Sequence, residues 1–184
     1  MELSDALKEV PGKKSDVRSA IEENKGFVVI MAGSDSDKPH IDLIVAALNG
    51  YGIKNQVRIA SAHKEPGVVE SLVRLYDSEK FPVVYVAVAG KTDALSGMIS
   101  FLSVNPVVSC PPDHPNASCL NNPPGSSNAY VGDPKNLARY VAQTFSHLDP
   151  QIRQKLENER DGKIIKLIGK DKEFSRYPYE VEVK

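Results

Sequence analysis

The chain has 184 residues, enough for one compact domain, and its 23 Lys and Arg nearly balance its 24 Asp and Glu, giving a net charge of -1. This balance gives no reason to expect a nucleic acid or an anionic membrane surface as a partner. No apolar run approaches about 20 residues, so no membrane-spanning helix is expected. Residues Met1–Lys25 lack the apolar core of a signal peptide, so we expect a cytoplasmic protein.

In chain order, the first clear pattern is the apolar run Phe27–Met31, which predicts a strand after a polar N-terminal extension over residues 1–24. A polar turn, Gly33–Pro39, leads into a predicted helix that ends near Asn49. Within that helix the apolar residues recur at the spacing i, i+3, i+4, i+7, which indicates one buried face. The segment therefore predicts a strand, a tight turn and a helix.

The same order repeats along the chain. Further strands are predicted at Ile53–Ala60, Val83–Ala89, Pro106–Cys110 and Asn128–Val131. Further helices are predicted after Pro66, from Leu95 to Leu102, from Pro134 to Leu148 and from Pro150 onwards, with an uncertain charged tail after Gly162. This alternation predicts a flavodoxin-like three-layer α/β/α sandwich with a central parallel sheet. We divide the chain into an extension over 1–24, a central domain over 25–148 and a C-terminal helix and tail over 149–184.

Three polar turns, Gly33–Pro39, Ser61–Gly67 and Gly90–Gly97, follow three of these strands. In parallel sheets, ligands bind outside the carboxyl ends of the strands, so the three turns are expected to meet in one crevice. The long loop Pro111–Ser127 is of a length that is usually either functional or disordered.

The first turn suits a phosphate group. A helix N-terminus attracts anions, and Ser34 and Ser36 offer hydroxyl groups to phosphate oxygens. The side chain of Asp37 can accept a hydrogen bond from a sugar hydroxyl, and Ser36 or Asp37 is expected to cap the helix. A capped turn that binds nothing is the alternative.

His63 is the natural proton carrier among these turns, because an unperturbed imidazole has a pKa of ~6.5. Lys64 and Lys91 could hold a carboxylate, a phosphate or the charge that develops on CO₂. The alternatives are an exposed or capping histidine and ordinary surface lysines. His147 ends a helix, where a capping role suffices, and His114 in the long loop could reach the crevice.

Several other chemistries are not indicated. The sequence contains no nucleophile elbow, no Walker lysine and no Gly-x-Gly-x-x-Gly after the first strand. Cys110 and Cys119 have no metal-site spacing, and no His, Asp and Glu residues cluster as metal ligands. We therefore expect proton transfer and electrostatic binding with neither a metal nor an organic cofactor.

Three motifs together resemble the phosphoribosylaminoimidazole carboxylase family of de novo purine synthesis. They are Gly33-Ser34-Asp35-Ser36-Asp37, Ser61-Ala62-His63-Lys64 and Ala89-Gly90-Lys91-Thr92-Asp93-Ala94-Leu95-Ser96-Gly97. The similarity runs over about residues 26–147. The resemblance implies a flavodoxin-like fold, a homo-octamer, and carboxylation of 5-aminoimidazole ribonucleotide without a metal or cofactor.

The family has two classes. Class I is a mutase of N-carboxyaminoimidazole ribonucleotide and typically has Ser-Ala-His-Arg and a second histidine, whereas class II uses CO₂ directly and has Ser-Ala-His-Lys. This chain has Lys64, lacks the second histidine and carries Ser109-Cys110-Pro111-Pro112, all of which resemble class II.

The resemblance also implies roles for individual residues. His63 matches the proton-transfer histidine, and Lys64 matches a catalytic position near the phosphate and carboxylate. The other matching substrate positions are Ser34 and Asp37 at the ribose, Ser36 and Ser61 at the phosphate and carboxylate, and Gly90, Lys91, Thr92 and Ala94 around the aminoimidazole and CO₂.

Two positions depart from the family pattern. The usual Arg-Ser-Asn is Lys91-Thr92-Asp93 here, and the usual Pro-Ser-Gly is Pro123-Pro124-Gly125. The carboxylate of Asp93 could disfavour CO₂ or change the substrate. The alternatives are therefore the class I mutase, a different carboxylase on the same fold, such as the pyridinium carboxylase of nickel-pincer synthesis, and a non-catalytic nucleotide-binding paralogue.

Overall fold

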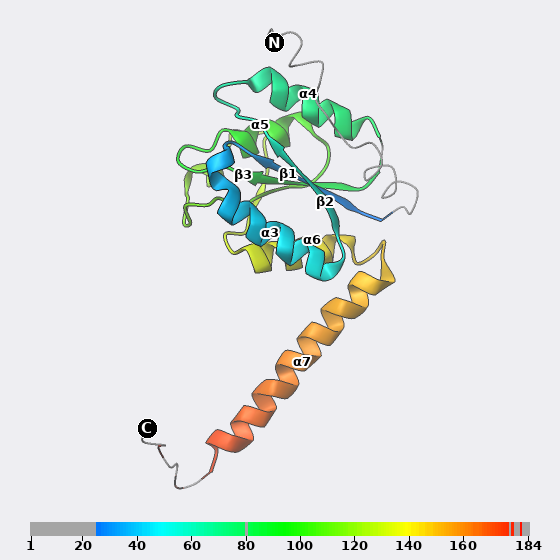
Figure 1. Ribbon diagram of the computed structural model, residues 1–184, viewed down its shortest axis with the longest axis vertical. Coiled ribbons are helices and arrows are strands. Elements are labelled where there is room, and N and C mark those ends of the chain that lie inside the picture. Colours follow the sequence, from blue (N-terminus) through cyan, green and yellow to red (C-terminus); the bar gives the residue numbers. More distant parts are fainter. Residues whose placement is uncertain (1–24, 80, 177, 179–180, 182–184) are drawn as a thin grey trace.

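A five-stranded parallel sheet forms the centre of the computed structural model, which describes residues 25–79, 81–176, 178 and 181 (Figure 1). The strands are β1 (Phe27–Ala32), β2 (Lys54–Ile59), β3 (Val83–Val88), β4 (Val107–Ser109) and β5 (Ala129–Tyr130). They lie in the order β2-β1-β3-β4-β5, and every neighbouring pair is parallel. The extension that we predicted over residues 1–24 lies outside the described residues.

Helices cover both faces of the sheet (Figure 1). The helical segments are the short turn η1 (Asp35–Asp37), α3 (Lys38–Tyr51), α4 (Pro66–Asp77), α5 (Leu95–Leu102), the short turn η2 (Ser118–Leu120), α6 (Pro134–Phe145) and α7 (Pro150–Phe174). α3 and α6 pack on one face, and α4 and α5 pack on the other. The predicted flavodoxin-like three-layer fold is confirmed.

The two central strands build both hydrophobic cores because successive side chains on a strand point to opposite faces. On β1, Val28 and Ile30 pack against α3 and α6, whereas Val29 and Met31 pack against α4 and α5. Every residue of β1 and β3 is buried. Continuous burial of this kind is typical of a parallel sheet with helices on both sides.

The structure differs from the sequence prediction at some apolar positions. In the strand predicted at Ile53–Ala60, Val57 and Ile59 lie on one face of β2, but they are exposed because β2 is an edge strand. In the helix predicted from Pro134, Tyr140 has the helical spacing of Leu137, Val141 and Phe145, yet it is exposed and they are buried. Helical spacing therefore identifies the buried face of a helix, but it does not show how many of the residues beside that face are buried too.

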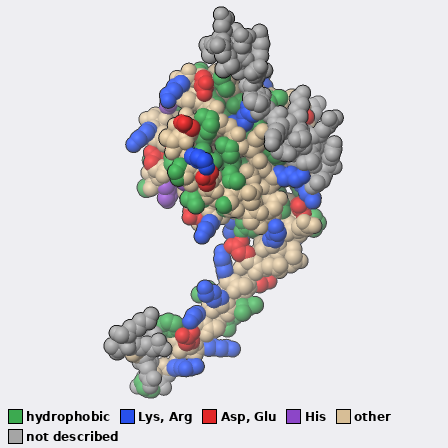
Figure 2. Space-filling view, in the orientation of Figure 1, with side chains coloured by type: hydrophobic (Ala, Val, Ile, Leu, Met, Phe, Trp, Pro, Cys, Tyr) green, Lys and Arg blue, Asp and Glu red, His purple; other side chains and the backbone are tan. Residues whose placement is uncertain are grey.

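The C-terminal segment is a long helix instead of an uncertain tail. α7 continues through Gly162 to Phe174, and it projects away from the sandwich (Figure 1). Ile152 and Leu156 of α7 are buried in the core, whereas the residues that follow are mostly exposed. Hydrophobic side chains lie among charged ones on the surface of this projecting helix (Figure 2).

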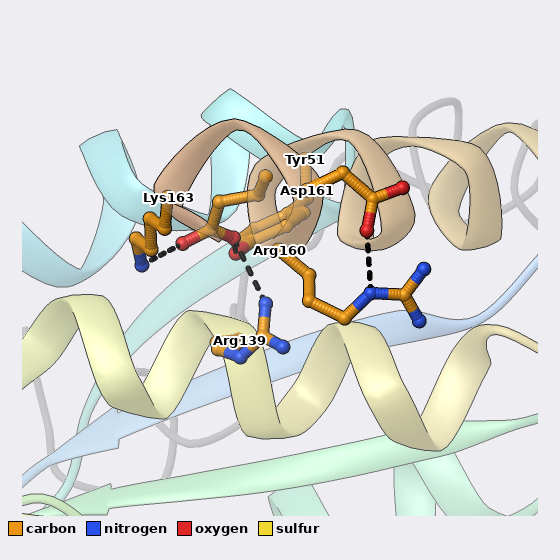
Figure 3. Close-up of polar contacts among 6 residues, drawn as sticks. Tyr51, Arg139, Arg160, Asp161 and Lys163 are labelled. Atoms are coloured by element: carbon orange, nitrogen blue, oxygen red, sulfur yellow. Dashed lines mark hydrogen bonds and ion pairs between the residues drawn. The ribbon is translucent and has the colours of Figure 1, made fainter. Parts of the chain in front are cut away.

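Three helices meet at the point where α7 leaves the domain. The carboxylate of Glu159 on α7 accepts hydrogen bonds from the hydroxyl of Tyr51 on α3 and, at 3.0 Å, from the guanidinium of Arg139 on α6 (Figure 3). Lys163 on the next turn of α7 pairs with the same carboxylate. These contacts lower the pKa of Glu159 from 4.5 to about 2, chiefly through Lys163 and Tyr51.

Among the described residues, no helix is both long and apolar enough to span a membrane.

Candidate active site

A cavity of about 480 Å³ lies where β1, β2 and β3 end. The register of the sheet brings these ends level, because Ala32 pairs with Ile59 on one side and with Val88 on the other. All the site residues predicted from the sequence line this cavity: Ser34, Ser36, Asp37, Ser61, His63, Lys64, Gly90, Lys91, Thr92 and Ala94. The three polar turns therefore meet, while the chemical roles of their side chains remain predictions.

The first wall of the pocket is the turn between β1 and α3. Ser34 caps the short turn η1, where its hydroxyl oxygen accepts the backbone N–H of Ser36 at 3.2 Å, whereas α3 begins without a side-chain cap. Asp37 makes no side-chain cap, so the predicted cap was wrong. The hydroxyl groups of Ser34 and Ser36 lie 2.8 Å apart, and together they form a polar edge at the start of α3.

Asp37 is the carboxylate of this wall. Partial burial raises its pKa, and the nearby carboxylates of Asp113 and Asp35 raise it further, while His40 opposes them. A carboxylate that shares the pocket with another negative group holds its proton more readily.

The second wall carries His63 and Lys64 on the turn between β2 and α4. The carbonyl of Ser61 accepts the backbone N–H groups of Lys64 at 3.3 Å and of Glu65 at 2.9 Å, which closes the turn. The side chain of Glu65 returns to accept the backbone N–H of Ser61 at 3.3 Å. His63 and Lys64 remain exposed at the pocket, where an incoming molecule can reach them.

The third wall is the loop between β3 and α5. Lys91 has a left-handed backbone, with φ of 60°. Asp93, the departure from the family pattern, does not line the cavity. It is 6% exposed, its backbone N–H donates to the hydroxyl of Ser118 at 2.9 Å, and its Oδ1 accepts the backbone N–H of Ser96 at 3.0 Å. The added carboxylate therefore caps α5 and does not face the pocket.

A fourth segment, which the sequence analysis did not include among the site residues, completes the pocket. Pro112 and Asp113 line it and follow the end of β4. Burial tends to raise the pKa of Asp113, but hydrogen bonds from the Lys91 backbone and the Asn116 side chain outweigh it, so the pKa is lowered. The signal available in the sequence was the position of Asp113 at a strand's carboxyl end, at the start of the long loop Pro111–Ser127.

The second departure, Pro124, lies outside this pocket. It lines a separate hollow with Met98, Phe101 and Asn122. The loss of a hydroxyl at that position therefore removes nothing from the cavity around His63.

Two of the other three histidines, His40 and His114, make contacts close to the pocket loops. His40 Nε2 lies 3.1 Å from the carbonyl of Cys110, and His114 Nδ1 lies 2.6 Å from the hydroxyl of Tyr130. His114 therefore bonds to Tyr130 and does not line the cavity. Cys110 is buried, which raises the pKa of its thiol to about 12. Within the described ranges, no three His, Cys, Asp or Glu side chains group in a way that could hold a metal ion.

Fold and pocket define a flavodoxin-like α/β protein with a polar site at the carboxyl edge of its sheet. The sequence matches the AIR carboxylase family over residues 27–164, and the chain belongs to that family. It is 33% identical, over 156 residues, to the phosphoribosylaminoimidazole carboxylase of Treponema denticola, covering 82% of this chain and 98% of that protein.

A solved structure and a second relative extend the comparison. The crystal structure of Treponema denticola PurE superposes with a TM-score of 0.76 at 32% identity, covering 83% of this chain and 100% of the other. The N5-carboxyaminoimidazole ribonucleotide mutase of Methanocaldococcus jannaschii is 29% identical over 153 residues, covering 79% of this chain and 95% of that protein. Both activities of the family are therefore represented among the relatives.

Proposed function

We propose that this protein carboxylates 5-aminoimidazole ribonucleotide with CO₂ to give 4-carboxy-5-aminoimidazole ribonucleotide in de novo purine biosynthesis, without ATP, a metal or an organic cofactor. The observation that carries the proposal is the meeting of three polar turns in one cavity, with His63, Lys64 and Lys91 among its lining residues. The name of the Treponema denticola relative supports the same activity.

The nucleotide's phosphate belongs at the turn before α3. Ser36 and the backbone from Ser34 to Asp37 lie at the start of a 14-residue helix, whose free N–H groups and dipole favour an anion. Ser34 and Asp37 would hold the ribose hydroxyls. Ser61 and Lys64 from the next turn would hold the phosphate and the new carboxylate.

The chemistry needs a base and fixed positive charge. An aminoimidazole is enamine-like, so its ring carbon can attack CO₂ directly to form the new C–C bond. The resulting non-aromatic intermediate must lose a proton from that carbon, and His63 at the pocket accepts it. Lys64 and Lys91 stabilise the developing carboxylate. Gly90, Thr92 and Ala94 surround the aminoimidazole ring and CO₂ and keep them in position.

Lys64 favours CO₂ over the N-carboxy substrate. A lysine is a compact point charge, whereas arginine presents a planar fork that matches a carboxylate already formed. A lysine therefore suits a site that makes a carboxylate. The alternative to test is the mutase activity, because one relative, from Methanocaldococcus jannaschii, is named as a mutase.

Parallel assays with the two substrates test this proposal. We expect turnover of 5-aminoimidazole ribonucleotide that depends on free CO₂ and needs no ATP. The control is N-carboxyaminoimidazole ribonucleotide with free CO₂ scavenged. Fast turnover of that substrate under scavenging would assign the mutase activity, and turnover of neither substrate would leave a non-catalytic nucleotide-binding protein.

We also propose that the protein acts as a homo-octamer. The projecting part of α7 exposes Ile164, Ile165, Leu167 and Ile168, and Phe174 at its end is exposed as well. Closed symmetry is the usual form of homo-oligomers, and neighbouring copies would bury this apolar surface.

Light scattering tests the assembly. Ile165→Glu places a charge on the exposed apolar surface and is expected to lower the mass in solution. Lys166→Glu, an exposed substitution on the same turn, is the matched control and is expected to keep the mass. An active monomer of the wild-type protein would contradict the proposal.

A further inference from the structure

Lys91 is the one non-glycine residue with a positive φ in the described part of the chain, at 60°. L-residues rarely adopt this conformation, because the β-carbon crowds the backbone. Such a residue persists only where its surroundings over-determine its geometry, and it often marks a functional site. Lys91 lines the candidate active site, so the contacts that hold its backbone bear on that site.

Three side chains from the loop after β4 contact the backbone of Lys91: Asp113 at its N–H, and Asn116 and Ser118 at its carbonyl. Its N–H donates to Oδ2 of Asp113 at 2.7 Å. Its carbonyl oxygen accepts a hydrogen bond from Nδ2 of Asn116 at 2.9 Å. The second Nδ2 hydrogen of Asn116 goes to Oδ1 of Asp113 at 3.0 Å, so the two side chains also bind each other.

The amide of Asn116 can take only one orientation. Its Oδ1 accepts a hydrogen bond from the backbone N–H of Ser118 at 3.0 Å. The Ser118 hydroxyl, with one hydrogen to donate, lies 2.6 Å from the same Oδ1 and 3.0 Å from the Lys91 carbonyl. Both its donors and its acceptor are thus used, and the side chain is almost fully buried, with 7% of the residue exposed. A flipped amide would place its oxygen against the oxygens of Lys91 and Asp113.

The sheet anchors this network. The hydroxyl of Tyr130 on β5 accepts the backbone N–H of Asn116 at 3.2 Å and lies 2.6 Å from Nδ1 of His114. Gly132 leaves room for the His114 ring, since an added β-carbon would lie 2.1 Å from its Nδ1. The loop from Asp113 to Asn116 is therefore attached to the strand beside β4.

We propose that Asp113, supported by Asn116, is a positioning residue that holds Lys91 in its left-handed conformation and so shapes the Gly90–Ala94 wall for the base end of the nucleotide. Each of its two carboxylate oxygens accepts one N–H group, so the side chain at this position must offer two acceptor oxygens. This inference rests on the proposed function. Asp113 also raises the pKa of Asp37 on the phosphate turn, but the inference concerns only its hydrogen bonds to the Lys91 wall.

The test compares two ligands on Asp113→Asn. An asparagine of the same shape must present an NH₂ group either to the Lys91 N–H or to the Asn116 amide, so one hydrogen bond is lost. We expect the Kd for 5-aminoimidazole ribonucleotide to rise about tenfold, a scale typical of one such bond. The Kd for ribose 5-phosphate, which lacks the base, is expected to change by less than about twofold.

Two further arms separate positioning from a general structural effect. Asp42→Asn, on the exposed surface of α3, is the matched control and is expected to leave both Kd values unchanged. In a Lys91→Gly background, where a positive φ carries no strain, adding Asp113→Asn is expected to cost less than about threefold.

Each contrary result has a distinct meaning. Unchanged affinity of Asp113→Asn for the nucleotide would overturn the inference, as would a parallel loss of ribose 5-phosphate binding or an equal loss in the Lys91→Gly background. Failure of the wild-type protein to bind the nucleotide would instead remove the proposed function, and this inference with it.

Discussion

Oδ1 of Asp93 accepts a 3.0 Å hydrogen bond from the backbone N–H of Ser96, so the carboxylate points into the first turn of α5. A negative group at a helix N-terminus is stabilised by the free N–H groups and by the helix dipole. The residue that departs most from the family pattern thus serves the helix that follows the pocket wall. Its side chain is not among those that line the cavity.

Replacing Asp93 should therefore affect stability more than activity. We expect Asp93→Ala to lower the free energy of unfolding by about 1 kcal/mol, the usual cost of a lost cap. Asp93→Asn keeps the capping oxygen and should cost less than about 0.5 kcal/mol. Denaturant unfolding measures both values. Turnover by Asp93→Asn should stay within about twofold of the wild type, and a marked change in substrate preference would show that the carboxylate does act on the pocket.

His63 is expected to carry the proton in the reaction. An imidazole exchanges protons near neutral pH, and His63 lies exposed at the pocket. His63→Asn should keep nucleotide binding and lose turnover by about 10²-fold or more, the scale of general acid–base catalysis. Calorimetric titration and a steady-state assay on the same sample separate the two effects. Near-normal turnover would remove His63 from the mechanism.

The left-handed backbone at Lys91 makes an unusual stability order testable. Glycine ordinarily destabilises relative to alanine, but at a positive φ alanine keeps the strain and glycine relieves it. We expect Lys91→Gly to be more stable than Lys91→Ala by about 1 kcal/mol. Both variants lack the lysine side chain, so the comparison isolates the backbone. The opposite order in denaturant unfolding would show that Lys91 does not hold φ near 60° in solution.

The carboxylate of Glu159 should make the attachment of α7 dependent on pH. Its pKa is lowered from 4.5 to about 2 by Lys163, Tyr51 and Arg139. A lowered pKa means that the stabilisation is complete above the unfolded value of 4.5 and is lost as the pH falls toward 2. Glu159→Gln should therefore melt below the wild type at neutral pH, and the difference should shrink below pH 4.5.

The control for this pH dependence is Glu70→Gln. Glu70 pairs with Arg74 inside α4 alone, whereas Glu159 joins three helices. We expect a much smaller change in Tm for Glu70→Gln, because exposed pairs within one helix contribute little. Because Glu159 is itself partly exposed, added salt should reduce its effect. A difference between Glu159→Gln and the wild type that does not vary with pH would contradict the assignment.

The sequence by itself determined the fold and the meeting of the three turns. Both follow from local patterns: an apolar run at β1, helical spacing in α3, and polar turns after β1, β2 and β3. Once the strands are parallel, their carboxyl ends must share one edge, and this geometry brings Ser34, His63 and Lys91 together.

Only the tertiary structure decided which side chains face the cavity and what holds them. The backbone N–H of Asp93 donates to Ser118, 25 residues along the chain, and the backbone N–H of Lys91 donates to Asp113, 22 residues away. Contacts of this kind depend on where two distant loops arrive after folding, so no local periodicity encodes them. The position of Asp113 after a strand was readable from the sequence, but its hydrogen bond to Lys91 was not. The three turns could be predicted because neighbouring residues form them.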